Sequence, residues 1–275
     1  MPETTAGTRL LAVIGSPVRH SLSPRIHSEF IRRAGLAGQY AYLAFDVTPE
    51  ALPAFVAGAR AMGMAGFNVT MPLKERVVPL LDELDASASA GAVNTVFARG
   101  GRLYGANTDG QGFVMSLTLS GGALPERAMI LGAGGSARVI AFALLGAGVS
   151  VTVASRRAVR FDTDDQRLQY CAWDEFPARL PGHDLLVNAT PLGMEGADKG
   201  DFADFGFLDA LPNGAAVYDL VYAPRRTSLL KQAEARGLVA QNGLAHLVCQ
   251  AALSFERFTG QALGLDAVRD VLAAL

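Results

Sequence analysis

A glycine-rich turn between a predicted strand and a predicted helix is the feature that most constrains the fold of this chain. The apolar run Arg127–Leu131 leads into Gly132-Ala133-Gly134-Gly135, and a helical pattern then covers Ser136–Leu145. Another strand is predicted at Val149–Ser155, so the elements follow the order that a dinucleotide-binding βαβ unit requires. In such a unit the glycines let the backbone approach a pyrophosphate at the helix N-terminus. A turn that serves only to pack the helix on the strand is the alternative.

The residues after the second strand of this unit indicate which nucleotide it binds. A site for NAD carries Asp or Glu about 20 residues beyond the glycines, whereas this chain has Ser155-Arg156-Arg157 and then Arg160. Guanidinium groups bind phosphate through paired donors. We therefore expect NADP, which has a 2′-phosphate, although these arginines could also form a solvated turn.

The N-terminal part of the chain shows its own alternation of strands and helices. Helices are expected to begin at Ser23, Thr48 and Pro72, which follow turn-forming residues. This order predicts a mostly parallel sheet covered by helices, with a hairpin as its antiparallel edge. The predicted strands are Leu10–Ile14, Tyr40–Val47 and Gly66–Thr70, and the hairpin pairs Val93–Ala98 with Arg102–Ala106.

The rest of the chain completes a second α/β series and a helical tail. We expect an α/β fold with two domains and a cleft between them: residues 1–107 joined by C-terminal helices 246–275, and residues 108–245 as a Rossmann-type domain. The further strands are predicted at Leu168–Trp173, Asp184–Ala189, Ala216–Leu220 and Val239–Gln241, and the further helices at Asp109–Leu119, Thr227–Arg236, Leu244–Thr259 and Leu265–Ala274.

Composition excludes several classes of protein. Only 18% of the 275 residues are charged and the net charge is −2, so no basic surface for nucleic acid or membrane is expected. Two cysteines are too few for a secreted disulfide framework. The N-terminal residues lack the pattern of a signal peptide. We expect a cytoplasmic enzyme, monomeric or homodimeric, with a small-molecule substrate.

Polar residues gather after the predicted strands of the first series, at the edge where open α/β sheets bind ligands. Lys74 and Asp109 are candidates for the base that removes a hydroxyl proton while a hydride leaves for the nicotinamide. Structural alternatives are a solvated Lys74 at a helix start, and Asp109 or Ser23 as helix caps. We expect no metal site, because no cysteine or acid completes a set with His20 and His27.

At these positions the chain resembles the shikimate dehydrogenases, almost from end to end. The motifs that carry the resemblance are His20-Ser-Leu-Ser-Pro24, Asn68-Val-Thr-Met-Pro-Leu-Lys74, Ala92-Val-Asn-Thr95, Asn107-Thr-Asp-Gly110, Gly132-Ala-Gly-Gly-Ser-Ala137, Asn188-Ala-Thr-Pro-Leu-Gly-Met194, Tyr218-Asp-Leu-Val-Tyr222 and Gln250-Ala-Ala.

The resemblance implies reversible NADP-dependent reduction of 3-dehydroshikimate to shikimate, in the pathway to aromatic amino acids. It implies a substrate domain with Lys74 and Asp109 as the catalytic pair, and it makes Asn68 a support of the pocket. The substrate contacts implied are Ser21, Ser23, Thr70, Asn94, Tyr222 and Gln250. The NADP contacts implied are Gly132, Ala133, Gly134, Gly135, Ser136, Ala137, Ser155, Arg156, Arg157, Arg160, Thr190 and Gly243, the last near the nicotinamide.

Two departures from the family pattern keep alternatives open. The family commonly has Asn-Arg-Thr where this chain has Ser155-Arg156-Arg157, and it usually has Met where His246 stands. The alternatives are a relative that oxidises quinate or an aminoshikimate, possibly with NAD, and a non-catalytic NADP-binding sensor.

Overall fold

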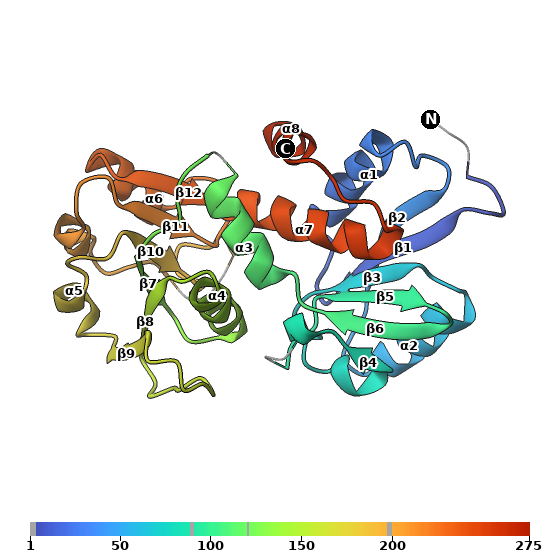
Figure 1. Cartoon of the computed structure of the whole chain (residues 1–275), viewed down its shortest axis with the longest axis horizontal. Coiled ribbons are helices and arrows are strands. Elements are labelled where there is room, and N and C mark those ends of the chain that lie inside the picture. Colours follow the sequence, from blue (N-terminus) through green and yellow to red (C-terminus); the bar gives the residue numbers. More distant parts are fainter. Residues whose placement is uncertain (1–3, 89–90, 120, 197–199) are drawn as a thin grey trace. The chain divides into compact units, whose positions relative to one another are not determined.

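The structure is a computed structural model that describes residues 4–88, 91–119, 121–196 and 200–275. The chain forms two compact units, Met1–Gly112 with Val248–Leu275, and Phe113–Leu247. Both divisions fall inside helices, α3 (Asp109–Thr118) and α7 (Leu244–Thr259). Each unit contains its own six-stranded sheet (Figure 1), so the predicted α/β fold with two mostly parallel sheets is confirmed. No helix in the described ranges is long and apolar enough to span a bilayer.

The sheet of the first unit is mixed, with strand order β2-β1-β3-β5-β6-β4. Strand β1 pairs in parallel with β2 and β3, while β5 is antiparallel to both β3 and β6. The predicted hairpin is confirmed, but it is not the edge of the sheet, because β4 pairs in parallel with the outer side of β6. The strands are β1 (Arg9–Gly15), β2 (Tyr40–Asp46), β3 (Gly66–Val69), β4 (Glu83–Leu84), β5 (Thr95–Arg99) and β6 (Arg102–Ala106).

Alternation along β3 assigns its residues to the two faces of this sheet. Phe67 and Val69 belong to a buried cluster with Val56 of α2 (Leu52–Ala61). Asn68 points to the opposite face, where it hydrogen-bonds Ser254 of α7. That face also carries α1 (Ser23–Arg33) and α8 (Leu265–Ala273), which contact each other. The strand therefore delivers one polar side chain, Asn68, to the face of the sheet that α7 covers.

The sheet of the second unit is entirely parallel, with strand order β12-β11-β10-β7-β8-β9. Chain order reverses beside β7, and an open sheet binds ligands at such a switch point. The strands are β7 (Arg127–Leu131), β8 (Ser150–Ser155), β9 (Leu168–Ala172), β10 (Leu185–Asn188), β11 (Ala216–Asp219) and β12 (Val239–Asn242).

Helices cover both faces of the second sheet. Ala128 and Ile130 of β7 pack with residues of α4 (Gly135–Gly146), whereas Met129 and Leu131 pack with residues of α5 (Phe176–Arg179) and α6 (Ser228–Ala235). The continuous apolar run of β7 is thus explained, since a central parallel strand is buried on both faces.

The prediction that a helix begins at Pro72 is wrong. Turns follow β3, and only the short 3-10 helix η1 (Val78–Leu80) forms before β4. The backbone oxygen of Lys74 accepts a hydrogen bond from the N–H of Val93 at 2.9 Å instead of from a residue one turn ahead. Pro79 has no N–H to offer the carbonyl of Glu75. A helical ladder cannot continue through this segment.

The other predicted elements are present with small shifts. Helix α2 begins at Leu52 rather than near Thr48, with Pro53 in its first turn, where a missing N–H costs nothing. The prediction missed the short elements η2 (Ala86–Ala88), α5 and η3 (Gly206–Ala210), which carry too few residues to show a period.

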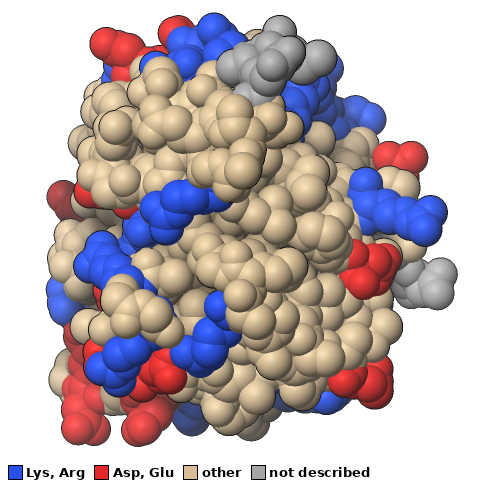
Figure 2. Space-filling model, turned by 90° about the vertical axis from the view of Figure 1, so that its right-hand side faces the viewer, with Lys and Arg blue, Asp and Glu red and all other residues tan. Residues whose placement is uncertain are grey.

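The low charge content of the sequence is visible on the surface. Figure 2 shows a broad area of one face without Lys, Arg, Asp or Glu, with the charged side chains gathered toward its margins.

Candidate functional site

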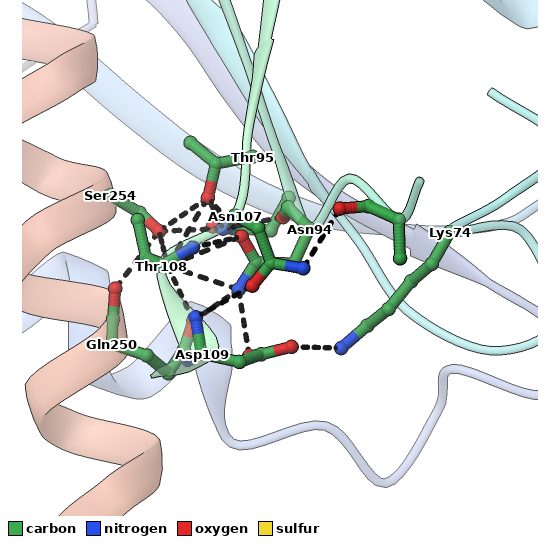
Figure 3. Close-up of polar contacts among 10 residues, drawn as sticks. Lys74, Asn94, Thr95, Asn107, Thr108, Asp109, Gln250 and Ser254 are labelled. Atoms are coloured by element: carbon green, nitrogen blue, oxygen red, sulfur yellow. Dashed lines mark hydrogen bonds and ion pairs between the residues drawn. The ribbon is translucent and has the colours of Figure 1, made fainter. Parts of the chain in front are cut away.

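Lys74 and Asp109 form a close ion pair in the first unit. Lys74 lies in the turns after β3 and Asp109 is the first residue of α3. The lysine Nζ lies 2.5 Å from Asp109 Oδ2, and the side chains are 26% and 13% exposed (Figure 3). Each is reachable from solvent and largely enclosed, as an acid–base group that meets a substrate must be.

Asn94 holds the other oxygen of the Asp109 carboxylate. Its Nδ2 donates to Asp109 Oδ1 at 2.8 Å, and Gln250 Oε1 lies 3.3 Å from the same nitrogen. Figure 3 shows Asn94, which directly precedes β5, and Gln250, which lies on helix α7, converging on Asp109. The structure therefore brings four predicted residues of distant sequence position into one polar cluster.

A close helix contact brings Gln250 to this cluster. A Cβ on Gly112 of α3 would lie 2.6 Å from the backbone nitrogen of Gln250 on α7. Only glycine allows the two helices to approach this closely. Gly112 could not be recognised from the sequence, since nothing in its local pattern distinguishes it from other glycines.

Ser21 and Thr70 lie in loops beside strand ends of the first unit, and Ser23 is the first residue of α1. The Oγ of Ser21 accepts the backbone N–H of Ser23 at 3.2 Å, and Ser23 is buried. The alternative that Ser23 caps α1 is wrong, because the helix begins at Ser23 and its cap residue, Leu22, makes no side-chain bond. A Cβ on Gly15 would fall 2.3 Å from Thr70 Cγ2, so β1 must end in glycine beside this threonine.

Behind Asn94 lie further buried polar residues, of which only Asn68 had an expected role, as a support of the pocket. The Thr95 and Thr108 hydroxyls and Ser254 of α7 are fully buried and interconnected. Asn68 donates to Ser254 and to the backbone oxygen of Asn94. The available signal was the repeated Asn-Thr pair at residues 94–95 and 107–108, which places two hydroxyls in an otherwise apolar setting.

The glycine loop of the second unit precedes the N-terminus of α4. Gly132 has φ +104°, and its missing Cβ would approach Thr190 Cγ2 to 3.0 Å, so glycine is required. Gly134, Gly135 and Ser136 are exposed there, whereas Ala137 is completely buried in the core. The first N–H groups of a helix lack intrahelical partners and attract anions.

A cavity of about 1210 Å³ lies beside this loop within the second unit. Its lining includes Gly132, Ser155, Arg156, Arg157 and Thr190. Ser155 Oγ donates to the backbone oxygen of Arg157 at 2.6 Å, which fixes the arginine turn. Neither Arg156 nor Arg157 forms an ion pair with any residue that the structure describes. Both arginines thus line the cavity outside any ion pair within the described ranges, although its lining also includes Asp174, Asp201 and Asp204.

A buried carboxyl organises the Thr190 side of the cavity. Asp219 Oδ1 accepts from Asn188 Nδ2 at 3.0 Å, and Asn188 Oδ1 in turn accepts from the Thr190 hydroxyl at 2.6 Å. Thr227 donates to Asp219 Oδ2 at 2.7 Å. Burial raises the pKa of Asp219 to about 6, against these hydrogen bonds, which lower it.

Four residues that the sequence analysis named do not line this cavity: Arg160, Gly243, Tyr222 and His246. The Arg160 guanidinium lies over the Tyr170 ring, 4.3 Å from its centre, and Arg160 does not line the cavity. A Cβ on Gly243 would lie 2.1 Å from the Leu220 carbonyl oxygen, so packing alone requires this glycine. Tyr222 is half-buried, and burial raises its pKa. His246 donates its backbone N–H to the Tyr218 hydroxyl at 3.0 Å.

Within the described ranges, no group of three His, Cys, Asp or Glu is placed to hold a metal ion.

Comparison with known proteins agrees with this geometry. Residues 13–96 match the family model described as the shikimate dehydrogenase substrate binding domain. The shikimate dehydrogenase (NADP(+)) of Geobacillus kaustophilus is 41% identical in an alignment 267 residues long that covers 92% of this chain and 93% of that protein.

Solved structures extend the likeness to the whole fold. The Thermus thermophilus shikimate 5-dehydrogenase, solved with NADP(H) and shikimate, superposes with a TM-score of 0.82 at 36% identity, covering 97% of this chain and 99% of that one. A 5-ketofructose reductase from Gluconobacter has the same TM-score of 0.82 at 31% identity, with coverages of 98% and 99%. Identity to the Geobacillus protein over nearly the full length of both chains is decisive: this chain belongs to the shikimate dehydrogenase family.

Proposed function

We propose that the chain is an NADP-dependent shikimate dehydrogenase that interconverts 3-dehydroshikimate and shikimate. The observation that carries the proposal is the enclosed Lys74–Asp109 pair, held by Asn94 beside Gln250. A base near a substrate hydroxyl is what alcohol oxidation requires. The likeness to the Thermus enzyme, solved with both ligands, supports the same assignment.

The first unit is the substrate-binding and catalytic part in this proposal, and the second unit binds NADP. Asn94 and Gln250 present amides at the ion pair. Ser21 and Thr70 add hydroxyls from loops of the same unit, and Ser23 adds one from the start of α1. A small substrate with several hydroxyls suits such a set, because each polar group that it buries needs a partner. Tyr222 is assigned to the substrate as well.

The cavity of the second unit fits NADP. The exposed N-terminus of α4 suits a pyrophosphate, and Arg156 and Arg157 suit a 2′-phosphate because guanidinium binds phosphate in paired fashion. Thr190 lines the same cavity. Ala133, Ser155 and the backbone of Ala137 complete the assigned contacts, together with Gly243 near the nicotinamide. Bound NADP supplies the hydride acceptor for oxidation and the donor for reduction.

The Lys74–Asp109 pair carries the proton of the substrate hydroxyl. Because the two groups lie 2.5 Å apart, a proton can pass between them, and it is assigned to the pair rather than to one residue. Asp109 Oδ1 accepts a hydrogen bond from Asn94, and Oδ2 accepts one from Lys74. With both oxygens bound, the carboxylate has one fixed orientation toward the substrate.

A panel of initial rates tests the proposal. Shikimate, quinate and 5-ketofructose are each assayed with NADP and with NAD, in the direction in which each substrate reacts. The highest kcat/KM is expected for shikimate with NADP. Preference for quinate with NAD, or for 5-ketofructose, would replace the assigned substrate, and no turnover with any pair would favour the non-catalytic sensor.

A cytoplasmic location also belongs to the proposal. It is supported by Cys171 and Cys249, which are buried and form no disulfide.

A further inference from the structure

The polar residues behind Asn94 form a network with almost no access to water. Thr95, Thr108 and Ser254 are 0% exposed, Asn94 is 3% exposed and Asn68 is 7% exposed. A buried polar group without a hydrogen bond costs free energy, so each member must find its partner inside the network. The partners therefore limit how each side chain can be oriented.

The orientation of the Asn94 amide follows from a donor that cannot reverse. The backbone N–H of Thr108 can only donate, and it lies 2.8 Å from Asn94 Oδ1. The amide oxygen must face Thr108, so Nδ2 faces Asp109 Oδ1. The opposite orientation would place the amide oxygen against a carboxylate, which is repulsive.

Thr95 gives the same amide oxygen a second donor. Its Oγ1 lies 2.8 Å from Asn94 Oδ1, and because an amide oxygen only accepts, the single hydroxyl proton of Thr95 points to Asn94. Thr95 Oγ1 then accepts from Asn68 Nδ2 at 3.2 Å. It also lies 2.8 Å from Ser254 Oγ, whose own hydroxyl donates to the backbone oxygen of Gln250 at 3.0 Å.

Asn68 is itself oriented from the other side. Its Nδ2 donates to the backbone oxygen of Asn94 at 3.1 Å, so its Oδ1 faces Tyr42, whose hydroxyl donates at 2.7 Å. Burial raises the pKa of Tyr42 well above its usual value, which keeps this hydroxyl a donor. The chain of donors thus runs in one direction from Tyr42 through Asn68 and Thr95 to Asn94.

We propose that Thr95, supported by Ser254, is a positioning residue for the Lys74–Asp109 pair. Together with the backbone N–H of Thr108, its hydroxyl fixes the position from which the Asn94 amide donates to Asp109, and it touches neither substrate nor cofactor. This inference rests on the proposed function, since it concerns the geometry of the same ion pair. A displacement of about 1 Å at a reacting group can cost as much as about a hundredfold in rate.

Thr95→Val and Thr95→Ser test the role of the hydroxyl. Valine keeps the shape and removes the hydroxyl, whereas serine keeps the hydroxyl. Thr95→Val should lower kcat for shikimate at least about tenfold with KM for NADP within about twofold. Thr95→Ser should keep about half of the parent kcat or more. The control is Thr152→Val, which removes a buried hydroxyl bonded to His183 in the second unit and should leave kcat within about twofold.

Crystal structures of the two Thr95 variants give a readout that does not depend on turnover. In Thr95→Val the Asn94 amide oxygen keeps its Thr108 donor but loses its Thr95 donor, so the distance from Asn94 Nδ2 to Asp109 Oδ1 should lengthen beyond about 3.5 Å, whereas in Thr95→Ser it should stay near 2.8 Å. An unchanged Asn94 and kcat in Thr95→Val would overturn the inference, as would a Thr95→Ser variant as impaired as the valine variant. A parent chain that does not oxidise shikimate would refute the proposed function, while the structures would still decide the role of Thr95.

Discussion

His27→Phe should make the first unit more resistant to acid than it is in the parent chain. His27 is completely buried, and neither ring nitrogen has a hydrogen-bond partner among the described residues. Its ring stacks on Tyr42, with centroids 4.2 Å apart and the planes 5° from parallel. Burial lowers the pKa of His27 from 6.5 to about 3, against a smaller opposing effect of Asn68. The folded unit therefore excludes a proton that the unfolded chain binds.

The size of the effect follows from this difference in pKa. A folded-state pKa below the unfolded value contributes stability that is present above pH 6.5 and is lost as the pH falls toward 3. Each unit of pH below 6.5 costs about 1.4 kcal/mol, so at about pH 4.5 the parent loses about 3 kcal/mol that the phenylalanine variant does not lose. Any packing cost of the new ring is the same at both pH values and cancels in the comparison.

Hydrogen exchange of the β1 amides measures this free energy in the first unit. The stability difference between variant and parent should rise by about 3 kcal/mol in favour of the variant between about pH 7 and about pH 4.5. The β7 amides are the internal control, because His27 belongs to the other unit, and they should show no such change. A difference that is the same at both pH values would mean that His27 titrates normally and that its burial has been misjudged.

Three further changes probe other parts of the account. Arg156→Ala should raise KM for NADP about tenfold and KM for NAD much less, because only NADP carries the 2′-phosphate; equal increases in initial-rate assays would remove Arg156 from phosphate recognition. In the parent, the free energy of unfolding should fall by about 3 kcal/mol as pH rises from 3.8 through about 6, because the folded pKa of Asp219 lies above the unfolded one, and Asp219→Asn should not show this fall. Urea unfolding followed by Trp173 fluorescence measures the free energy, and parallel pH profiles of the two chains would contradict the prediction. Gly112→Ala should destabilise the chain by about 1–3 kcal/mol and raise KM for shikimate, because its Cβ would lie 2.6 Å from Gln250; an unchanged Tm and KM would show that the helices can part without cost.

The parts of the fold that follow from local patterns could be predicted from the sequence. The strand Arg127–Leu131 has the predicted bounds, because an apolar run ending in glycines leaves few alternatives. The segment after Pro72 could not be predicted, since its conformation depends on a hydrogen bond that the backbone N–H of Val93, just before β5, donates to the carbonyl of Lys74. Long-range pairing of this kind leaves no local signature.

The candidate site shows the same division. Lys74 and Asp109 were found because a charged pair after strand ends has chemistry that a structural residue does not need, and the structure brings them to 2.5 Å. The hydroxyls of Thr95 and Ser254 gave no such signal. Threonine is common in strands and serine is tolerated in helices, so only the tertiary contact between β5 and α7 shows that they meet.

Turnover of Lys74→Ala beside the parent tests the central claim most directly. Both purified proteins are given saturating shikimate and NADP⁺, NADPH formation is followed by its absorbance, and NADP⁺ binding is measured separately by titration. The parent should form NADPH, and the variant should lose at least about a hundredfold in kcat while its Kd for NADP⁺ stays within a few-fold, because Lys74 lies in the first unit and the cofactor cavity in the second. A variant that forms NADPH at the parent rate, or a parent that forms none, would contradict the account.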